Sequence, residues 1–382
     1  MTAAFIGPGT LITCSVAGIT HGYGLLWALV LGVVITILLL EISTRLTIVS
    51  HKNLGGAIIS SLHSPLLTRL IQLLIVGAIL IGNAAYQSGN LSGAVIGLQS
   101  FFPGLPVKAL FIAVALGASL LLWLGSYRGL EKLFTFLVFL MGVVFIMLLF
   151  VLPVDFGDML KGLNFFATPA GSFFSVVGLI GTTVVPYNLF LHSNAILNKW
   201  GKNLDYKTVR MDLVVSVIIG GLISGSILIG FASIASEGIQ VSRLADLTEK
   251  LSAQLGNWSV YFVGLGVFIA GLTSSLTAPL AAAYTITGVF GRSEGTQSKG
   301  FRFVWLLVIA TGLIVGLTGI RPLFIIQFAQ FANGLLLPVM AILMLIALRK
   351  QPGLWIKLAG AAVVLVTTLL AYKSISTVIN QW

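Results

Sequence analysis

Long apolar runs, separated by short polar connections, dominate the pattern of this 382-residue sequence. Several runs reach the roughly 20 residues that an α-helix needs to cross a bilayer. They are continuous rather than alternating, so they favour helices over a transmembrane β-barrel. Eleven spans are predicted, at about 2–20, 24–46, 67–99, 107–126, 131–153, 172–197, 211–234, 259–290, 302–320, 322–348 and 353–373. The predicted fold class is therefore an all-α polytopic membrane protein.

Two of the predicted spans are interrupted near their middle. The break residues are Gly7, Pro8 and Gly9 in the first span and Pro186 in the sixth. An odd number of crossings separates these spans, so they run in opposite directions. Paired broken helices of opposite direction indicate an inverted-repeat transporter with a site at the membrane midplane. A simple kink is the alternative for each proline taken alone, but the matched pair favours a site.

A helix break inside a membrane frees polar backbone groups. Carbonyls are freed at the end of the first half-helix and N–H groups at the start of the second. Lipid cannot satisfy them, so they persist where they line a cavity or meet a ligand. Pro8 and Pro186 suit the first position of a half-helix, because that position needs no N–H. We therefore expect unwound backbone at 7–10 and 183–187, with the two breaks facing each other.

Charged residues are few and unevenly placed. Hydrophobic residues make up 58% of the chain and charged residues 8%, and the net charge is +11. Fifteen of the 21 Lys and Arg residues lie in connections on one side of the predicted spans, and six lie on the other. The positive-inside rule then places the N-terminus in the cytoplasm and the C-terminus outside, in a multi-pass protein of the cell (inner) membrane. The basic balance thus indicates a lipid bilayer as partner and no nucleic acid.

Four stretches of the sequence resemble one known family. They are GPGTLITCSVAGITHGYGLLW (7–27), GTTVVPYNLFLHS (181–193), GLTSSLTAPLAA (271–282) and QFAQFANGLLLP (327–338). They are similar to the first, sixth, eighth and tenth spans of the NRAMP family of proton-coupled divalent-metal transporters, and the resemblance covers nearly the whole chain. It implies a LeuT-like fold with alternating access, in which helices 1 and 6 are discontinuous.

The resemblance also implies a domain organisation. A single transporter domain is expected over 1–348, built from five-span inverted repeats at about 1–153 and 172–348. An additional C-terminal transmembrane helix is expected within 349–382.

The family's metal ligands, carried over by the resemblance, fall on residues of different chemistry. Its first-span aspartate falls on Gly7 and its asparagine on Thr10. In the sixth span its methionine falls on Val185 and its alanine carbonyl on Thr182, while the histidine after the proline becomes Tyr187. None of these side chains is a carboxylate or a thioether, the ligands that transition metals favour.

The acids elsewhere in the chain do not replace the missing ligands. Only Glu41 of the ten acids lies inside a predicted span, and Arg45 four residues later predicts an ion pair with it. The candidate substrate-binding residues are instead neutral: Gly7, Thr10, Thr182, Val185, Tyr187, Asn188 and Gln330. Span 8 adds hydroxyls that either join this site or serve helix packing: Thr273, Ser274, Ser275 and Thr277.

A neutral site of this kind leaves the substrate open. Hydroxyls and carbonyls can hold a hydrated cation such as Mg²⁺, which keeps its waters, or a monovalent cation or a neutral solute. The N-termini of the two second half-helices also favour an anionic group.

The positions that couple transport to protons in the family are altered too. Gln87 and Asn90 stand where the third span of the family holds two proton-handling acids, and neither amide titrates. His192 matches a family histidine, and it either relays a proton or donates a hydrogen bond to a neighbouring helix. We therefore expect that transport does not need a proton gradient.

The sequence thus predicts a monomeric NRAMP-related secondary transporter, by resemblance for divalent metal cations, with a hydrated ion such as Mg²⁺ favoured over Mn²⁺ or Fe²⁺. The alternatives are a transporter of a non-metal small solute or monovalent ion, and a transport-inactive sensor. No nucleophile–base pair converges within the spans, so neither an enzyme nor a cofactor is expected.

Overall fold

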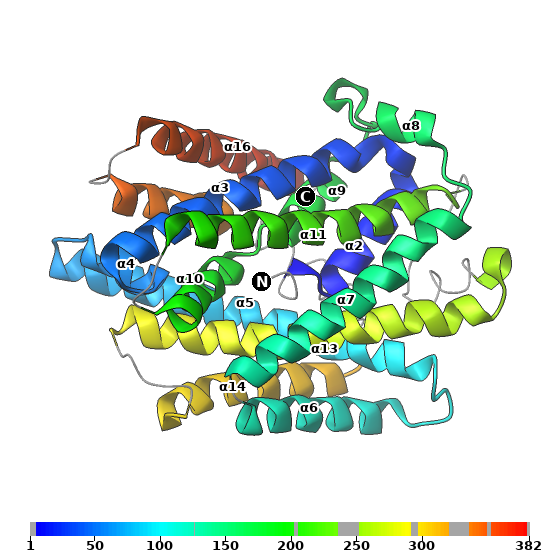
Figure 1. Ribbon diagram of the computed structural model, residues 1–382, viewed down its shortest axis with the longest axis horizontal. Coiled ribbons are helices and arrows are strands. Elements are labelled where there is room, and N and C mark those ends of the chain that lie inside the picture. Colours follow the sequence, from blue (N-terminus) through cyan, green and yellow to red (C-terminus); the bar gives the residue numbers. More distant parts are fainter. Residues whose placement is uncertain are drawn as a thin grey trace.

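Long helices run side by side through the part of the chain that the computed structural model describes, which is residues 5–125, 127–201, 205–235, 252–291, 297–320, 336–349 and 353–379. The longer elements are α2 (Pro8–His21), α3 (Leu26–Ser50), α5 (Pro65–Gln99), α6 (Val107–Leu124), α7 (Tyr127–Val151), α9 (Phe173–Thr183), α10 (Pro186–Trp200), α11 (Tyr206–Ala232), α13 (Trp258–Val289), α14 (Lys299–Leu317) and α16 (Leu354–Ile379). The shorter ones are η1 (Gly22–Leu25), α4 (Leu54–Ser60), α8 (Phe156–Lys161) and η2 (Phe165–Ala167). Figure 1 shows most of the long helices lying roughly along one direction.

The predicted spans correspond to these helices. Among the described residues, nine segments are long and apolar enough to cross a membrane, and the first, Pro8–Ser50, covers the first two predicted spans. The shorter apolar helix Leu336–Leu348 falls within the tenth predicted span. This confirms the polytopic α-helical fold class.

Glycines bring the central helices α5 and α13 into backbone contact. A Cβ added to Gly271 would lie 2.2 Å from the backbone nitrogen of Ala94, and one on Gly97 would lie 2.4 Å from that of Phe268. The same device joins α2 to α11, since a Cβ on Gly18 would lie 2.4 Å from the Leu228 carbonyl oxygen. Small residues at such crossings let membrane helices approach closely. Close approach matters because van der Waals contact, rather than the hydrophobic effect, drives helix association in lipid.

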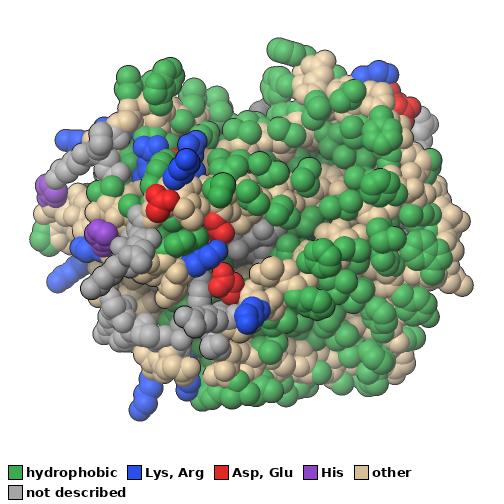
Figure 2. Space-filling view, in the orientation of Figure 1, with side chains coloured by type: hydrophobic (Ala, Val, Ile, Leu, Met, Phe, Trp, Pro, Cys, Tyr) green, Lys and Arg blue, Asp and Glu red, His purple; other side chains and the backbone are tan. Residues whose placement is uncertain are grey.

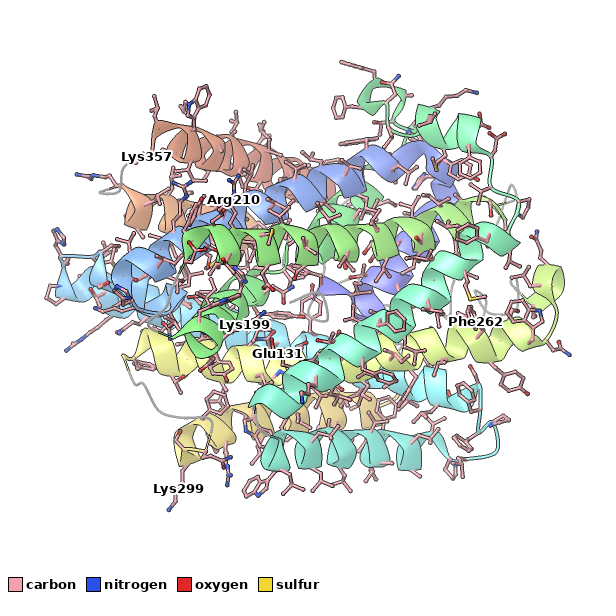
Figure 3. The ribbon with its side chains drawn as sticks, in the orientation of Figure 1. Glu131, Lys199, Arg210, Phe262, Lys299 and Lys357 are labelled. Atoms are coloured by element: carbon pink, nitrogen blue, oxygen red, sulfur yellow. The ribbon has the colours of Figure 1, made fainter. Side chains whose placement is uncertain are left out.

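Charge divides the surface along the helix direction. Figure 2 shows Lys and Arg side chains gathered toward one end of the bundle, while hydrophobic side chains cover most of the rest of the visible face. Lys199, Lys299 and Lys357 lie toward this basic end and Phe262 lies toward the other (Figure 3). The basic end contains the connections that the sequence places on the side with more Lys and Arg.

Candidate functional site

Both predicted helix breaks are present. Helix α2 begins at Pro8 after non-helical backbone at Ile6 and Gly7. The non-helical residues Val184 and Val185 separate α9 from α10, which begins at Pro186. The breaks are shorter than the predicted 7–10 and 183–187. Each proline takes the first helical position, where its fixed φ suits a helix and its missing N–H costs nothing, so the helix restarts there.

Two threonines join the breaks to each other. The Thr10 hydroxyl donates to the Phe5 carbonyl oxygen at 2.9 Å, and its oxygen lies 2.9 Å from the Thr182 hydroxyl oxygen. Because the Thr10 proton is used toward Phe5, Thr182 is the donor between the two hydroxyls. The first turn of α2 is thereby bound to the last turn of α9, and two predicted site residues meet in the buried interior.

Ser274 of α13 lies against Gly7, the position onto which the resemblance carries an aspartate. A Cβ added to Gly7 would lie 2.6 Å from the Ser274 hydroxyl oxygen and 3.8 Å from the Asn90 amide oxygen. Within the described part of the chain this hydroxyl has no hydrogen-bond partner, although it is buried. A serine hydroxyl therefore stands where a side chain at residue 7 would begin.

The other hydroxyls of this α13 cluster serve their own helix. Thr273 donates to the Ile269 carbonyl oxygen at 2.9 Å, and Ser275 donates to that of Leu272 at 2.9 Å. Thr277 donates to the Ser274 carbonyl oxygen at 3.5 Å. Sequence reasoning left the cluster open between a site and helix packing, and Ser274 is the member that lies against the break.

The two amides predicted at the coupling positions brace α5 against α13. Gln87 donates to the Ser275 carbonyl oxygen at 3.0 Å, and Asn90 donates to that of Ser274 at 3.1 Å. Both residues are buried. Their NH₂ groups are thus used between helices, while the Asn90 amide oxygen lies on the side of Gly7.

Helix α5 also contacts both breaks directly. A Cβ on Gly93 would lie 2.4 Å from Cγ of Pro8, so α5 touches the start of α2. Farther along the helix, the ring of Tyr86 meets that of Tyr187 edge-on, with centroids 6.0 Å apart. One helix therefore lines both interruptions.

The remaining predicted substrate-binding residues divide between described and undescribed parts. Val185, Tyr187 and Asn188 are buried at the junction of α9 and α10. Gln330 lies outside the described residues.

His192 bonds to a neighbouring helix. Its Nε2 lies 2.9 Å from the Thr44 hydroxyl on α3, and it is buried. Nδ1 has no hydrogen-bond partner in the part of the chain described. The contact with Thr44 agrees with the interpretation that His192 forms a hydrogen bond to a neighbouring helix. It does not test whether His192 relays a proton.

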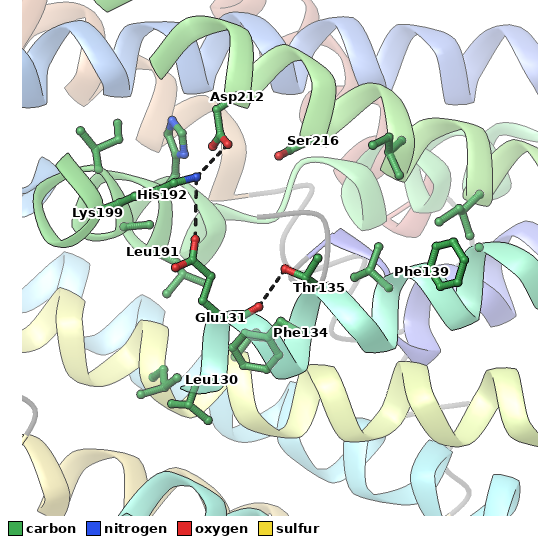
Figure 4. Close-up of a pocket in the computed structure, with 18 of the residues that line it drawn as sticks. Leu130, Glu131, Phe134, Thr135, Phe139, Leu191, His192, Lys199, Asp212 and Ser216 are labelled. Atoms are coloured by element: carbon green, nitrogen blue, oxygen red, sulfur yellow. Dashed lines mark hydrogen bonds and ion pairs between the residues drawn. The ribbon is translucent and has the colours of Figure 1, made fainter. Parts of the chain in front are cut away.

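A cavity of about 760 Å³ reaches His192 from the basic end of the bundle (Figure 4). It lies among α7, α10, α11 and α13, with walls that are largely apolar. Toward the basic end, Lys199 Nζ lies 3.0 Å from the Asp212 carboxylate and 3.7 Å from that of Glu131. This cluster joins three helices that are distant in sequence, so no local pattern signals it.

The described residues contain no group of three or more His, Cys, Asp or Glu side chains able to hold a metal ion.

Comparison with known proteins decides the family. The family described as natural resistance-associated macrophage protein-like (Nramp) matches residues 1–377. The chain belongs to the Nramp family.

Relatives of this Nramp protein include two from Bacillus subtilis (strain 168). Divalent metal cation transporter MntH is 27% identical over 324 residues, which cover 81% of this chain and 74% of the relative. The uncharacterized membrane protein YcsG is 23% identical over 389 residues, covering 100% of this chain and 93% of the relative.

Solved structures agree with the fold. The Eremococcus coleocola manganese transporter superposes with a TM-score of 0.81 at 19% identity, covering 98% of this chain and 84% of that one. MhsT, solved with L-phenylalanine, superposes with a TM-score of 0.55 at 13% identity, covering 97% and 96%. Neighbours of both kinds confirm the predicted LeuT-like fold.

Glu41 of this Nramp protein forms an ion pair with Arg45, as predicted. Its carboxylate accepts from Arg45 Nε at 3.0 Å and from the Tyr206 hydroxyl, and Arg210 Nε lies 3.6 Å away. With 6% of its surface exposed, the acid is paired at the α3–α11 contact and ties these two helices together.

Proposed function

We propose that this Nramp protein is a secondary transporter that carries a divalent metal cation across a cell membrane, and that the cation keeps part of its water shell, as Mg²⁺ does. Membership of the family supports the transporter, and relatives that are named divalent metal cation transporters support the ion class. The observation that carries the hydrated ion is the neutral surrounding of Gly7, where Ser274 and Asn90 stand closest.

Electrostatics supports a hydrated ion at such a site. A bare divalent ion in a low-dielectric interior needs compensating negative charge, because neutral dipoles offset little of the hydration free energy that the ion has lost. Mg²⁺ dehydrates reluctantly and usually keeps several waters, whose hydrogens point outward and need acceptors. Hydroxyl and amide oxygens at Thr10, Ser274 and Asn90 are acceptors of this kind.

The proposed route alternates between the two membrane faces. The cavity that reaches His192 from the basic end is its cytoplasmic part in our proposal, because basic connections remain inside the cell. Repeats over 1–153 and 172–348 are proposed to rock against each other, with the N-terminus in the cytoplasm and a monomer as the working unit. Neutral Gln87 and Asn90 support transport that does not require a proton gradient.

A second candidate is a transporter of a small carboxylate. Helices α2 and α10 both begin at the breaks, and neither has an acidic residue in its first turn or a side-chain cap. Such helix N-termini attract electron-rich oxygen. This observation favours an anionic solute as the alternative to a metal.

Uptake into proteoliposomes tests the proposal. The purified protein is reconstituted and supplied separately with Mg²⁺, Mn²⁺ and lactate, with empty liposomes as the control. We expect saturable Mg²⁺ uptake that exceeds Mn²⁺ uptake. Lactate uptake without Mg²⁺ uptake would support the second candidate, and Mn²⁺ uptake that exceeds Mg²⁺ uptake would contradict a hydrated substrate.

A further inference from the structure

Asn83 on α5 is a buried amide whose hydrogen-bonding groups are unused. Only 1% of its surface is exposed. Neither its amide oxygen nor its amide nitrogen has a hydrogen-bond partner among the residues described. Buried side-chain amides are nearly always paired, because they lose their water on burial, so an unpaired one calls for a functional explanation.

A small cavity lies beside this amide at the break in the sixth span. Its volume is about 10 Å³, and it is lined by Asn83, Pro186, Tyr187 and Met340 together with Ala78, Ile79, Gly82 and Leu336. A volume of this size admits about one water molecule. Pro186 contributes no N–H, and most of the wall is apolar. Asn83 therefore offers this cavity both an acceptor and donors.

The position of Asn83 relates it to the substrate site proposed above. It precedes Gln87 by four residues on α5, so both amides lie on one face of this helix. That face continues to Asn90, whose oxygen lies beside Gly7. The amide face thus runs from one break to the other.

We propose that Asn83 contacts the transported cation through water. One water ligand of the hydrated ion enters the cavity at Pro186, and the Asn83 amide oxygen accepts a hydrogen bond from this water. This inference rests on the proposed function. Contact through water suits the location, because the start of α10 carries a partial positive charge that disfavours a bare cation. A single water ligand also matches the size of the cavity.

Binding of Mg²⁺ to the purified full-length protein tests the proposal. The variants are Asn83→Leu, which removes the hydrogen-bonding groups at similar size, and Asn83→Asp, which adds a charge. Gln72→Leu is the matched control, because Gln72 lies on the same helix and donates to the Val289 carbonyl oxygen at 3.1 Å, away from the breaks. Calorimetry gives the Mg²⁺ affinity, and the melting temperature without Mg²⁺ reports folding.

We expect Asn83→Leu to weaken Mg²⁺ binding about tenfold or more, as loss of outer ligands does in metal sites, without lowering the melting temperature. Asn83→Asp should bind Mg²⁺ more tightly than the unmodified protein, and Gln72→Leu should bind it equally well. Unchanged Mg²⁺ affinity in both Asn83 variants would overturn this inference alone. If neither the unmodified protein nor Gln72→Leu binds Mg²⁺, the proposed function fails, and this inference fails with it.

Discussion

Gly7 and Ser274 lie together at the first break, in the site that we propose for the substrate. The resemblance assigns a metal-binding aspartate to position 7. In this protein the Ser274 hydroxyl oxygen lies 2.6 Å from the place that a Cβ at position 7 would occupy. A new side chain at position 7 therefore requires Ser274 to turn away. Placing the ligands that the resemblance implies into the proposed site therefore means changing the opposing helix as well as the break.

We predict that Gly7→Asp, Thr10→Asn and Val185→Met, combined with Ser274→Ala, create measurable Mn²⁺ binding. The change supplies a carboxylate, an amide and a thioether, which suit a transition metal, and removes the oxygen that crowds position 7. Calorimetry should show Mn²⁺ affinity about tenfold or more above that of the triple variant with Ser274 intact. Ser274→Ala alone is the control. A quadruple variant that folds and binds no Mn²⁺ would refute this account of the site.

Residue patterns could locate the breaks but not their surroundings. Pro8 and Pro186 are visible in the sequence, because a proline inside an apolar span has few structural roles. The hydrogen bond between Thr10 and Thr182 joins residues 172 positions apart, and nothing local encodes it. The Ser274 contact likewise depends on how α13 packs. From the sequence alone, the serines and threonines of that helix are equally consistent with a substrate site and with helix packing.

Helix α5 organises the bundle, since it lines both breaks and packs against α13 through backbone contact. This packing depends on the absence of side chains at the crossing. Gly97 lies at the crossing, whereas Gly77 on the same helix has no atom within 4 Å of an added Cβ. The chain therefore offers a matched pair of substitutions on one element.

Gly97→Ala should destabilise the protein, because its Cβ would lie 2.4 Å from the backbone nitrogen of Phe268 and backbone cannot easily yield. We expect a loss of about 1–3 kcal/mol, the usual range for overpacking. Gly77→Ala should be neutral or stabilising by up to about 1 kcal/mol, because alanine favours a helix. Melting curves of both variants in the same detergent measure this. Equal melting temperatures would argue against close α5–α13 packing.

The lengths of the helices were also more predictable than their ends. The apolar runs gave the spans, since about 20 consecutive apolar residues have little alternative to a membrane helix. The breaks proved shorter than predicted, because each proline begins a helix instead of extending the unwound segment. The cluster of Glu131, Lys199 and Asp212 was not predictable, because it forms only when three helices converge.

Among the described residues, buried acids and histidines are scarce along the path that we propose between the two faces. Gln87 and Asn90 use their NH₂ groups on carbonyls of α13, and Glu41 is paired with Arg45. His192 is the buried titratable residue that lies on the cavity wall. An imposed proton gradient therefore has few groups through which it could drive substrate movement.

We predict that Mg²⁺ uptake into proteoliposomes proceeds equally with and without an imposed pH gradient, and without acidification of the interior. A pH-sensitive dye inside the vesicles reports proton movement during uptake. Proton entry in strict proportion to Mg²⁺ would contradict the prediction. In that event His192→Gln, which retains a hydrogen-bonding side chain but does not titrate, would show whether this histidine carries the proton.

The preference for a hydrated cation over a stripped transition metal is the central claim, and direct titration of the unmodified protein with Mn²⁺ tests it. Gly7, Thr10 and Val185, at the positions that the resemblance matches to metal ligands, offer a transition metal no carboxylate, side-chain amide or thioether. We expect weak or undetectable heat of Mn²⁺ binding under conditions in which Mg²⁺ binds. Micromolar Mn²⁺ binding, tighter than that of Mg²⁺, would contradict it.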